Sequence, residues 1–250
     1  MLSIIIPTYN EEDFLPALLK SLENQTYRDF EVIVADAKST DQTREIAVAY
    51  GCQVVEGGPP AMGRNHGAAA ASGETLLFLD ADVILPDKSF LSDVLREFRG
   101  RRLEVATCRI DPMTDDPRDR FFHWVFNVFV TSSQWLFPHA PGFFILIRKS
   151  VFEAIRGFDE KIMLAEDHDL TTRAADIGRF RILRSRTLPV SVRRFERDGR
   201  FNVIAKYVLA ELYMRTFGPV YTDLFRYRFG YRKGVYNHRR RIRESVRRFF

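Results

Sequence analysis

The chain has 250 residues, of which 46% are apolar and 28% are charged. This length suits one large domain, or one domain with an appendage. The composition excludes a globally disordered chain, and 14 glycines and 11 prolines exclude collagen-like repeats. Cys52 and Cys108 are too few for a disulfide framework or a four-cysteine zinc site, so we expect reduced thiols in a cytoplasmic protein.

Positive charge is concentrated near one end of the chain. Residues 226–250 contain ten basic residues and one acidic residue, a net charge of +9. Because the whole chain carries +5, the rest carries −4. The high isoelectric point therefore describes this segment and not the whole surface. The apolar run at 2–6 has no basic leader before it, so no signal peptide is expected.

Short apolar runs alternate with stretches of helical spacing over the first hundred residues. The runs predict strands at 2–6, 30–35, 53–55 and 75–79. Continuously apolar strands separated by helices indicate a parallel sheet covered on both faces. A doubly wound α/β fold is therefore the leading expectation, with ligands at the carboxyl ends of the strands.

Residues 121–147 contain no Asp, Glu, Lys or Arg. The stretch is long enough to span a bilayer. Because prolines, Gly142 and a central polar cluster interrupt it, we favour an aromatic helix at 123–137 followed by a buried strand at 142–147.

The C-terminal part has a different pattern. Charged residues interrupt the apolar residues of 201–225, which favours an amphipathic helix over a membrane span. We expect an α/β domain over 1–200 and a helical, basic C-terminal extension over 201–250.

Polar side chains follow three of the predicted strands. They are Asn10, Glu11 and Glu12 after the first, residues 36–41 after the second, and Asp80 and Asp82 after the fourth. Helix capping or a turn explains any one of these loops equally well. A shared ligand site is the better explanation if all three loops face one crevice.

An apolar strand that ends in two acids is the sharpest of these features. Asp80 and Asp82 lie two residues apart, directly after residues 76–79. Two such carboxylates repel each other unless a cation lies between them. Mg²⁺ binds one or two carboxylates and completes its shell with water and substrate phosphates. The pair therefore favours a metal site that holds a diphosphate.

The order of several short motifs resembles that of the family 2 glycosyltransferases. The matching segments are residues 3–11, 31–36 with 39–41, 63–67, 78–82, 141–144, 157–160 and 166–170 with Arg173. The resemblance covers about residues 2–180. It implies the glycosyltransferase-A fold, with a mixed, mainly parallel sheet flanked by helices.

The resemblance also implies roles for individual residues. Pro7, Thr8, Tyr9 and Glu11 would line the nucleoside pocket, and Asp36 would accept a hydrogen bond from the base. Arg64 would lie near the base and the phosphates, where its fork of donors suits phosphate. Asp80 would contact the ribose and the metal, and Asp82 would bind the cation, Mg²⁺ or Mn²⁺. Asp167 matches the catalytic base, and Glu166 would position the acceptor.

The implied reaction is inverting transfer of a sugar from a UDP- or GDP-sugar to an acceptor hydroxyl or phosphate. The cation would neutralise the departing diphosphate, and a carboxylate would take the acceptor proton. From the local sequence alone, acids favoured in the first turn of a helix are the better explanation of Glu166 and Asp167, and only the family resemblance reverses that order. A retaining transferase and a nucleotidyltransferase are alternatives on the same scaffold. A non-enzymatic nucleic-acid-binding protein is disfavoured, because it leaves the acids unexplained.

This chain departs from the family pattern at three places, one of which is the stiffened turn at residues 57–60, before Arg64. Ala37 and Lys38 follow Asp36 where an acid and a glycine are commoner. Many members carry a histidine ligand after the last strand, where this chain has Arg193 and Arg194. The metal therefore has fewer protein ligands, or an arginine takes part of the phosphate neutralisation.

The composition of residues 226–250 bears on the acceptor and on the location of the protein in the cell. Aromatic residues interleave with the basic ones in 226–250, a mixture that suits an anionic membrane surface. We therefore expect a peripheral enzyme on the inner face of the membrane with a lipid-linked acceptor, or alternatively a solvated basic helix. The five histidines show no metal-ligand spacing, and His168 is the one to test because it adjoins Asp167.

Overall fold

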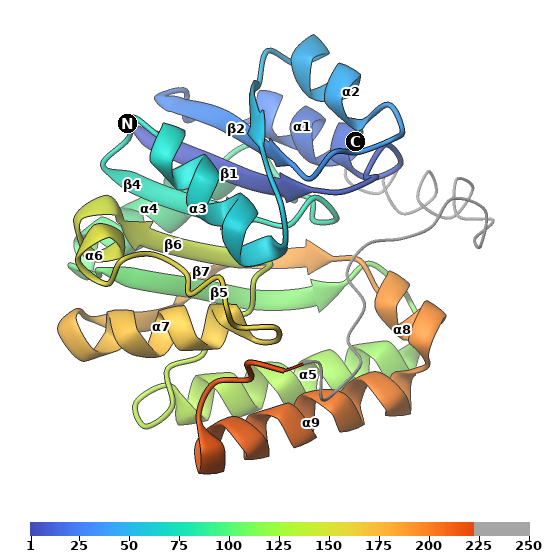
Figure 1. Ribbon diagram of the computed structural model, residues 1–250, viewed down its shortest axis with the longest axis vertical. Coiled ribbons are helices and arrows are strands. Elements are labelled where there is room, and N and C mark those ends of the chain that lie inside the picture. The colour runs from blue at the N-terminus through green and yellow to red at the C-terminus, as the bar shows by residue number, and fades with distance from the viewer. Residues whose placement is uncertain (223–250) are drawn as a thin grey trace.

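A computed structural model describes residues 1–222 of the chain (Figure 1). Within this range a seven-stranded sheet has the order β3-β2-β1-β4-β6-β5-β7. Its strands are β1 Leu2–Thr8, β2 Phe30–Asp36, β3 Gln53–Glu56, β4 Thr75–Leu79, β5 Val105–Pro112, β6 Phe144–Arg148 and β7 Phe180–Val190. The helices are α1 Leu15–Glu23, α2 Thr43–Ala49, α3 Pro60–Ala70, α4 Phe90–Gly100, α5 Pro117–Ser133, α6 Lys149–Ala154, α7 Glu166–Ile177, α8 Arg193–Asp198 and α9 Arg200–Phe217.

The sheet is mixed and mainly parallel, as the sequence predicts. Strand β1 pairs in parallel with β2 and β4, and β2 pairs in parallel with β3. Strand β6 is antiparallel to both β4 and β5, whereas β5 and β7 are parallel. Because β1, β2 and β4 are parallel, their carboxyl ends lie at one edge of the sheet, and the loops after them meet there.

Two apolar layers sandwich the sheet. In β1, Ile4 and Ile6 pack on one face with α1 and α4, and Ile5 packs on the other face with α3 and α7. This alternation follows from the two-residue period of a strand. Helix α3 lies close to β1 because Gly67 has no side chain, since a Cβ there would lie 2.4 Å from Ile5 Cγ2.

Four predicted strands, at 2–6, 30–35, 53–55 and 75–79, are confirmed to within two residues by β1 to β4. The strand predicted at 142–147 is β6, which begins at Phe144.

The helix predicted at 123–137 is wrong at both ends, because α5 runs from Pro117 to Ser133. It begins earlier because the Asp116 side chain accepts a hydrogen bond from the Arg118 backbone N–H, with Pro117 in the first turn. In the described residues no helix is both long enough and apolar enough to cross a bilayer.

The helix predicted over 201–225 is α9, which ends at Phe217. Gly218 follows with φ of 84°. That left-handed conformation suits glycine and stops a helix. The basic segment 226–250 lies outside the described residues, and the division of the chain at residue 200 stays a prediction.

Candidate functional site

The loops after β1 and β2 are joined through Asp36, the last residue of β2. Its carboxylate is fully buried. It accepts hydrogen bonds from the Thr8 hydroxyl at 3.1 Å and the Ser39 hydroxyl at 2.5 Å, and Arg44 pairs with it at 3.2 Å. Asp36 therefore holds the two loops together, and its predicted contact with a base stays a prediction. Tyr9 is 43% exposed beside it.

Arg193 connects the first strand end to the acids after β4. Its Nη1 and Nη2 donate to the two carboxylate oxygens of Glu11, at 2.7 and 2.9 Å. Its Nε lies 2.8 Å from Oδ2 of Asp82. All three side chains are no more than 11% exposed. The guanidinium thus lies against the acid predicted to bind the cation, at the place where the family often carries a histidine.

Arg64 makes the corresponding connection on the other side. Its Nη2 donates to Oδ1 of Asp80 at 2.9 Å, and its Nη1 donates to Oε1 of Glu166 at 2.6 Å. Arg64 is 3% exposed. In this structure its guanidinium therefore contacts two carboxylates, which does not exclude its predicted place near the phosphates. Arg64 joins the end of β4 to the start of α7. Glu166, the first residue of α7, lies 102 positions after Arg64 in the sequence.

Asp167 lies next to this arginine. Its Oδ2 accepts a 2.6 Å hydrogen bond from the Gly142 backbone N–H. A Cβ on Gly142 would lie 2.6 Å from Arg64 Nη2 and 3.4 Å from Asp167 Oδ2, so only glycine fits between them. Glu166 and Asp167 also occupy the first turn of α7, where the helix dipole favours acids, and their assignment to the site stays a prediction.

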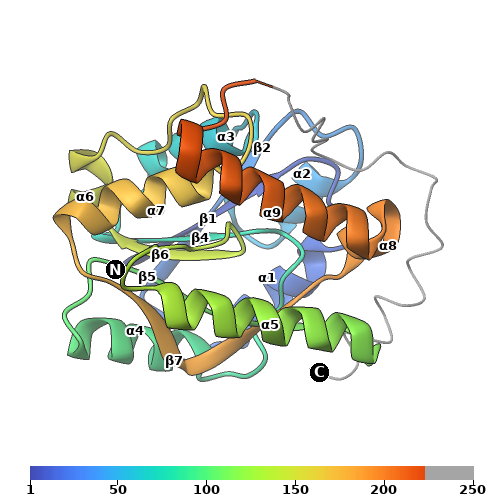
Figure 2. The same ribbon diagram turned by 90° about the horizontal axis from the view of Figure 1, so that it is seen from below.

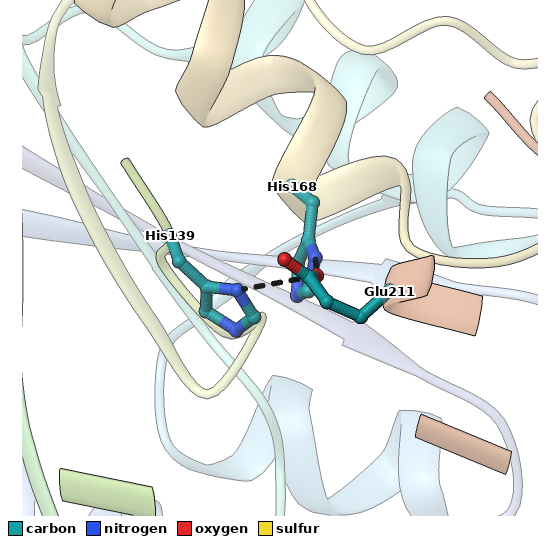
Figure 3. Close-up of side chains that lie close together, drawn as sticks. All are labelled: His139, His168 and Glu211. Carbon is teal, nitrogen blue, oxygen red and sulfur yellow. Dashed lines mark ion pairs between the residues drawn. The ribbon is translucent and has the colours of Figure 1, made fainter. Parts of the chain in front are cut away.

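A second cluster adjoins Asp167 on the side of α9 (Figure 3). His168 Nδ1 lies 3.4 Å from Glu211 Oε2, and His139 Nδ1 lies 4.0 Å from the same oxygen. The ring centroids of the two histidines are 3.5 Å apart. Burial, and then the charge of His168, lowers the pKa of His139 well below its usual value. Although burial opposes it, the charges of Asp167 and Glu211 raise the pKa of His168. Burial and the neighbouring charges therefore shift the pKa values of the two rings in opposite directions.

Metal-ligating side chains occur in two places. Within residues 1–222, one group of three His, Cys, Asp or Glu residues has ligand atoms within 4.8 Å of one another, and it is His139, His168 and Glu211. Sequence spacing misses this group because its members come from three separate segments. The predicted ligands Asp80 and Asp82 instead lie beside Arg64 and Arg193.

The site around Asp80 and Asp82 still suits a cation. Burial raises the pKa of Glu11 to about 7 in spite of Arg193, and Asp82 and Asp80 contribute to the rise. Burial also raises the pKa of Asp80, although Arg64 opposes it, and Asp82 adds to the rise. Carboxylates that favour protonation in this way are short of positive charge. Their oxygens are the ligands that Mg²⁺ and Mn²⁺ prefer.

The structure brings most of the predicted residues to one end of the sheet. Glu166, Arg64 and Asp80 form one connected set, and Asp82, Arg193 and Glu11 form another beside it. Pro7 and Thr8 end β1 at the same edge. Sequence reasoning missed the donor to Asp167, although the motif at 141–144 contains it, and it missed Glu211 because α9 has no counterpart in the motifs.

Parts of this chain are similar in sequence to other proteins. The O-antigen chain rhamnosyltransferase WbaN of Salmonella anatum is 28% identical over 194 residues, which are 70% of this chain and 61% of WbaN. The GalNAc(5)-diNAcBac-PP-undecaprenol beta-1,3-glucosyltransferase of Campylobacter jejuni is 34% identical over 90 residues, 32% of this chain and 29% of that protein. The chain thus spans less than two thirds of either relative.

The fold also matches solved structures. The mannosyltransferase PcManGT from Pyrobaculum calidifontis, in complex with GDP-Man and Mn²⁺, superposes with a TM-score of 0.70 at 21% identity. The match covers 86% of this chain and 63% of PcManGT. A sequence model of the family described as Glycosyl transferase family 2 matches residues 3–156, more than half of the chain. The chain therefore belongs to glycosyl transferase family 2.

Proposed function

We propose that this protein transfers a sugar from a UDP- or GDP-sugar to an acceptor hydroxyl or phosphate, with inversion at the sugar. The observation that carries the proposal is the pair of arginines that gathers the acids at one end of the sheet. Arg193 links Glu11 to Asp82, and Arg64 links Asp80 to Glu166. This arrangement puts the acids for the donor and the acids for the acceptor side by side.

The donor end of the site has two parts in this proposal. Pro7, Thr8, Tyr9 and Glu11 line the nucleoside pocket, with Asp36 facing the base. Asp80 and Asp82 would hold Mg²⁺ or Mn²⁺, which when bound supplies positive charge to the diphosphate. The GDP-Man and Mn²⁺ of the PcManGT structure support this choice of donor and cation.

The acceptor end uses the first turn of α7. Asp167 takes the proton of the acceptor hydroxyl as that oxygen attacks the anomeric carbon, and the bond from that carbon to the diphosphate oxygen breaks, so that the nucleoside diphosphate leaves. The Gly142 N–H supports this role because it donates to Oδ2 and orients the carboxylate, whose oxygens can accept a further hydrogen bond. Glu166, fixed by Arg64, positions the acceptor. One base and one displacement invert the sugar.

The acceptor itself is proposed to be lipid-linked. The name of the Campylobacter relative, which contains undecaprenol, supports this substrate class. The basic and aromatic composition of residues 226–250 supports a peripheral place on an anionic membrane.

Thermal stabilisation by a panel of nucleotide sugars, each with and without Mn²⁺ or Mg²⁺, tests the donor. We expect one UDP- or GDP-sugar to raise the melting temperature only with the metal. Asp82→Asn should abolish that rise. A panel with no metal-dependent rise would overturn the proposal. The anomer of the product, determined by NMR, separates inversion from retention. Transfer of a nucleotide with release of inorganic diphosphate, in place of UDP or GDP, would indicate a nucleotidyltransferase.

A further inference from the structure

The exposed side of α5 is apolar. The exposed large side chains are Phe121, Trp124, Val125, Val128 and Phe129, and they recur with helical spacing. Trp124 is 61% exposed. The opposite side of the helix buries His123 and Val130. A helix on the surface of a soluble protein normally exposes its polar side to water. Helix α5 instead exposes apolar side chains.

Helix α9 shows the same inversion. Its exposed apolar residues are Phe201, Val208, Leu209, Leu212 and Phe217, with exposed fractions from 53% to 82%. Val203 and Ala210 are buried on the other side. Glu211, adjacent to Leu212, contacts His168 beside the catalytic end of the site. The side of α9 that carries Glu211 therefore borders His168, which adjoins the proposed base Asp167.

The two helices form one surface, the α5–α9 face. We define it as the exposed apolar residues of both helices together with Trp135, Leu136 and Phe137, which follow α5. The helices are tied at both ends: Arg200 pairs with Asp119, and the Arg215 guanidinium lies 3.8 Å from the centroid of the Phe137 ring. Figure 2, which views the molecule from below, shows both helices on the near side. So large an apolar face on a protein surface marks an interaction site.

A basic pocket adjoins this face. Its volume is about 320 Å³, and its lining includes Trp135 and four arginines, Arg101, Arg102, Arg179 and Arg181. The Arg181 guanidinium stacks 3.4 Å from the centroid of the Trp135 ring, which is itself 68% exposed. Arg101 pairs with Glu97. Burial, followed by the charges of Arg179 and Arg101, lowers the pKa of Arg181.

We propose that the α5–α9 face rests on an anionic lipid bilayer, with a phosphate-bearing headgroup in the arginine pocket. Both tryptophans of the chain, Trp124 and Trp135, lie in this face, and tryptophan prefers the depth of the headgroups. An apolar helix face with cationic residues at its margin binds anionic lipid. Each phosphodiester headgroup offers the arginine fork an acceptor of matching shape.

This proposal adds a membrane contact to the proposed function. It rests on the proposed function only where it concerns the lipid-linked acceptor. A lipid-linked acceptor held in the same bilayer would reach Asp167 from the α9 side, because Glu211 of α9 and Asp167 both adjoin His168. The sequence alone suggests the basic segment 226–250 as the membrane contact. The structure adds a separate surface that is folded, apolar and next to the site.

Co-flotation of the full chain with vesicles tests the proposal. One set of vesicles contains phosphatidylcholine only, and the other contains phosphatidylcholine and phosphatidylglycerol in equal amounts. We expect flotation with the mixed vesicles and weaker flotation with the neutral ones. The double variant Leu209→Ser/Leu212→Ser should lower the bound fraction by more than about tenfold, since two exposed leucines that the bilayer would bury are lost from the contact.

Matched variants separate the two parts of the surface. Val48→Ser/Ile177→Ser removes two apolar side chains that are 64% and 58% exposed on α2 and α7, and should float as the wild type does. Arg102→Glu/Arg179→Glu should remove the preference for phosphatidylglycerol. Arg28→Glu/Arg96→Glu, with the same change in net charge, should retain most of it.

Several outcomes would overturn the proposal. Every variant keeps residues 226–250. If Leu209→Ser/Leu212→Ser floats as well as the wild type, the binding is assigned to that segment. A dimer that dissociates in this variant, with no flotation of the wild type, would assign the face to a second copy. Thermal stabilisation by the nucleotide sugar is measured on each protein. A variant that no longer floats but is still stabilised by the nucleotide sugar has lost only its lipid contact. A wild type that floats but is stabilised by no donor contradicts the proposed function and not the lipid contact.

Discussion

The backbone N–H of Gly142 donates a 2.6 Å hydrogen bond to Asp167 Oδ2, across 25 positions of sequence. A Cβ at position 142 would lie 2.6 Å from Arg64 Nη2. One position without a side chain therefore sets the separation between the proposed catalytic base and the arginine that holds Asp80 and Glu166.

Gly142→Ala is expected to displace Arg64 from its two carboxylates and to lower kcat at least about tenfold, because Asp80 and Glu166 then lose the group that positions them and a misplacement of about 1 Å in an active site can cost about 10²-fold. Steady-state kinetics with the donor identified in the panel measure this. Gly100→Ala is the control, because a Cβ there meets nothing within 4 Å. Unchanged kcat in Gly142→Ala would show that this spacing is unimportant.

Asp167→Asn removes the proposed base while keeping the size of the side chain. We expect nucleotide-sugar binding to persist and turnover to fall by about 10² to 10⁴, the usual contribution of a general base. The control is Asp176→Asn, an exposed acid on the same helix. Isothermal titration with the donor, beside a turnover assay, distinguishes the two effects. Loss of donor binding together with turnover would place Asp167 at the donor end instead.

Arg193→Ala leaves two nearly buried carboxylates, Glu11 and Asp82, without their shared arginine. Breaking a buried ion pair costs about 3 kcal/mol or more of unfolding free energy. Urea denaturation measures the loss. Arg193→Lys should recover only part of it, because an ammonium cannot reproduce the two-pronged contact with Glu11. The exposed pair of Lys20 with Glu23 supplies the control, since Lys20→Ala should leave unfolding close to wild type.

The contact of Glu211 with His168 predicts a pH dependence. The hydrogen bond from His168, aided by Arg215, lowers the pKa of Glu211 from 4.5 to about 2. Its stabilising effect is therefore complete above pH 4.5 and lost as the pH falls toward 2. The pKa of His168 is raised above 6.5, so its contribution is complete below pH 6.5 and lost as the pH rises through the higher value.

Glu211→Gln should remove the Glu211 contribution and the part of the His168 contribution that Glu211 supplies, whereas the part due to Asp167 stays. The loss of unfolding free energy, relative to wild type, should be largest between about pH 4.5 and 6.5 and smaller on either side. Urea denaturation at a series of pH values measures it, and the exposed Glu45→Gln on α2 is the control. A loss that is constant with pH would mean that the contact is one of packing and not of charge.

The sequence determined the local features of this protein. Strands β1 to β4 could be predicted because a buried strand in a parallel sheet is continuously apolar, as Leu76 to Leu79 are. The acids Asp80 and Asp82 could be located at a strand end for the same reason. The family could be recognised because its motifs are short and lie in a fixed order.

Tertiary structure decided the contacts between distant segments. Arg193 and Glu11 lie 182 positions apart, and no spacing rule connects them. His139, His168 and Glu211 meet for the same reason. The apolar spacing of α5 predicts a helix, but a helix with apolar residues on several sides does not reveal which of them its neighbours bury. Only the packed structure shows that Trp124 and Leu209 are left outside, because burial depends on what the rest of the chain covers.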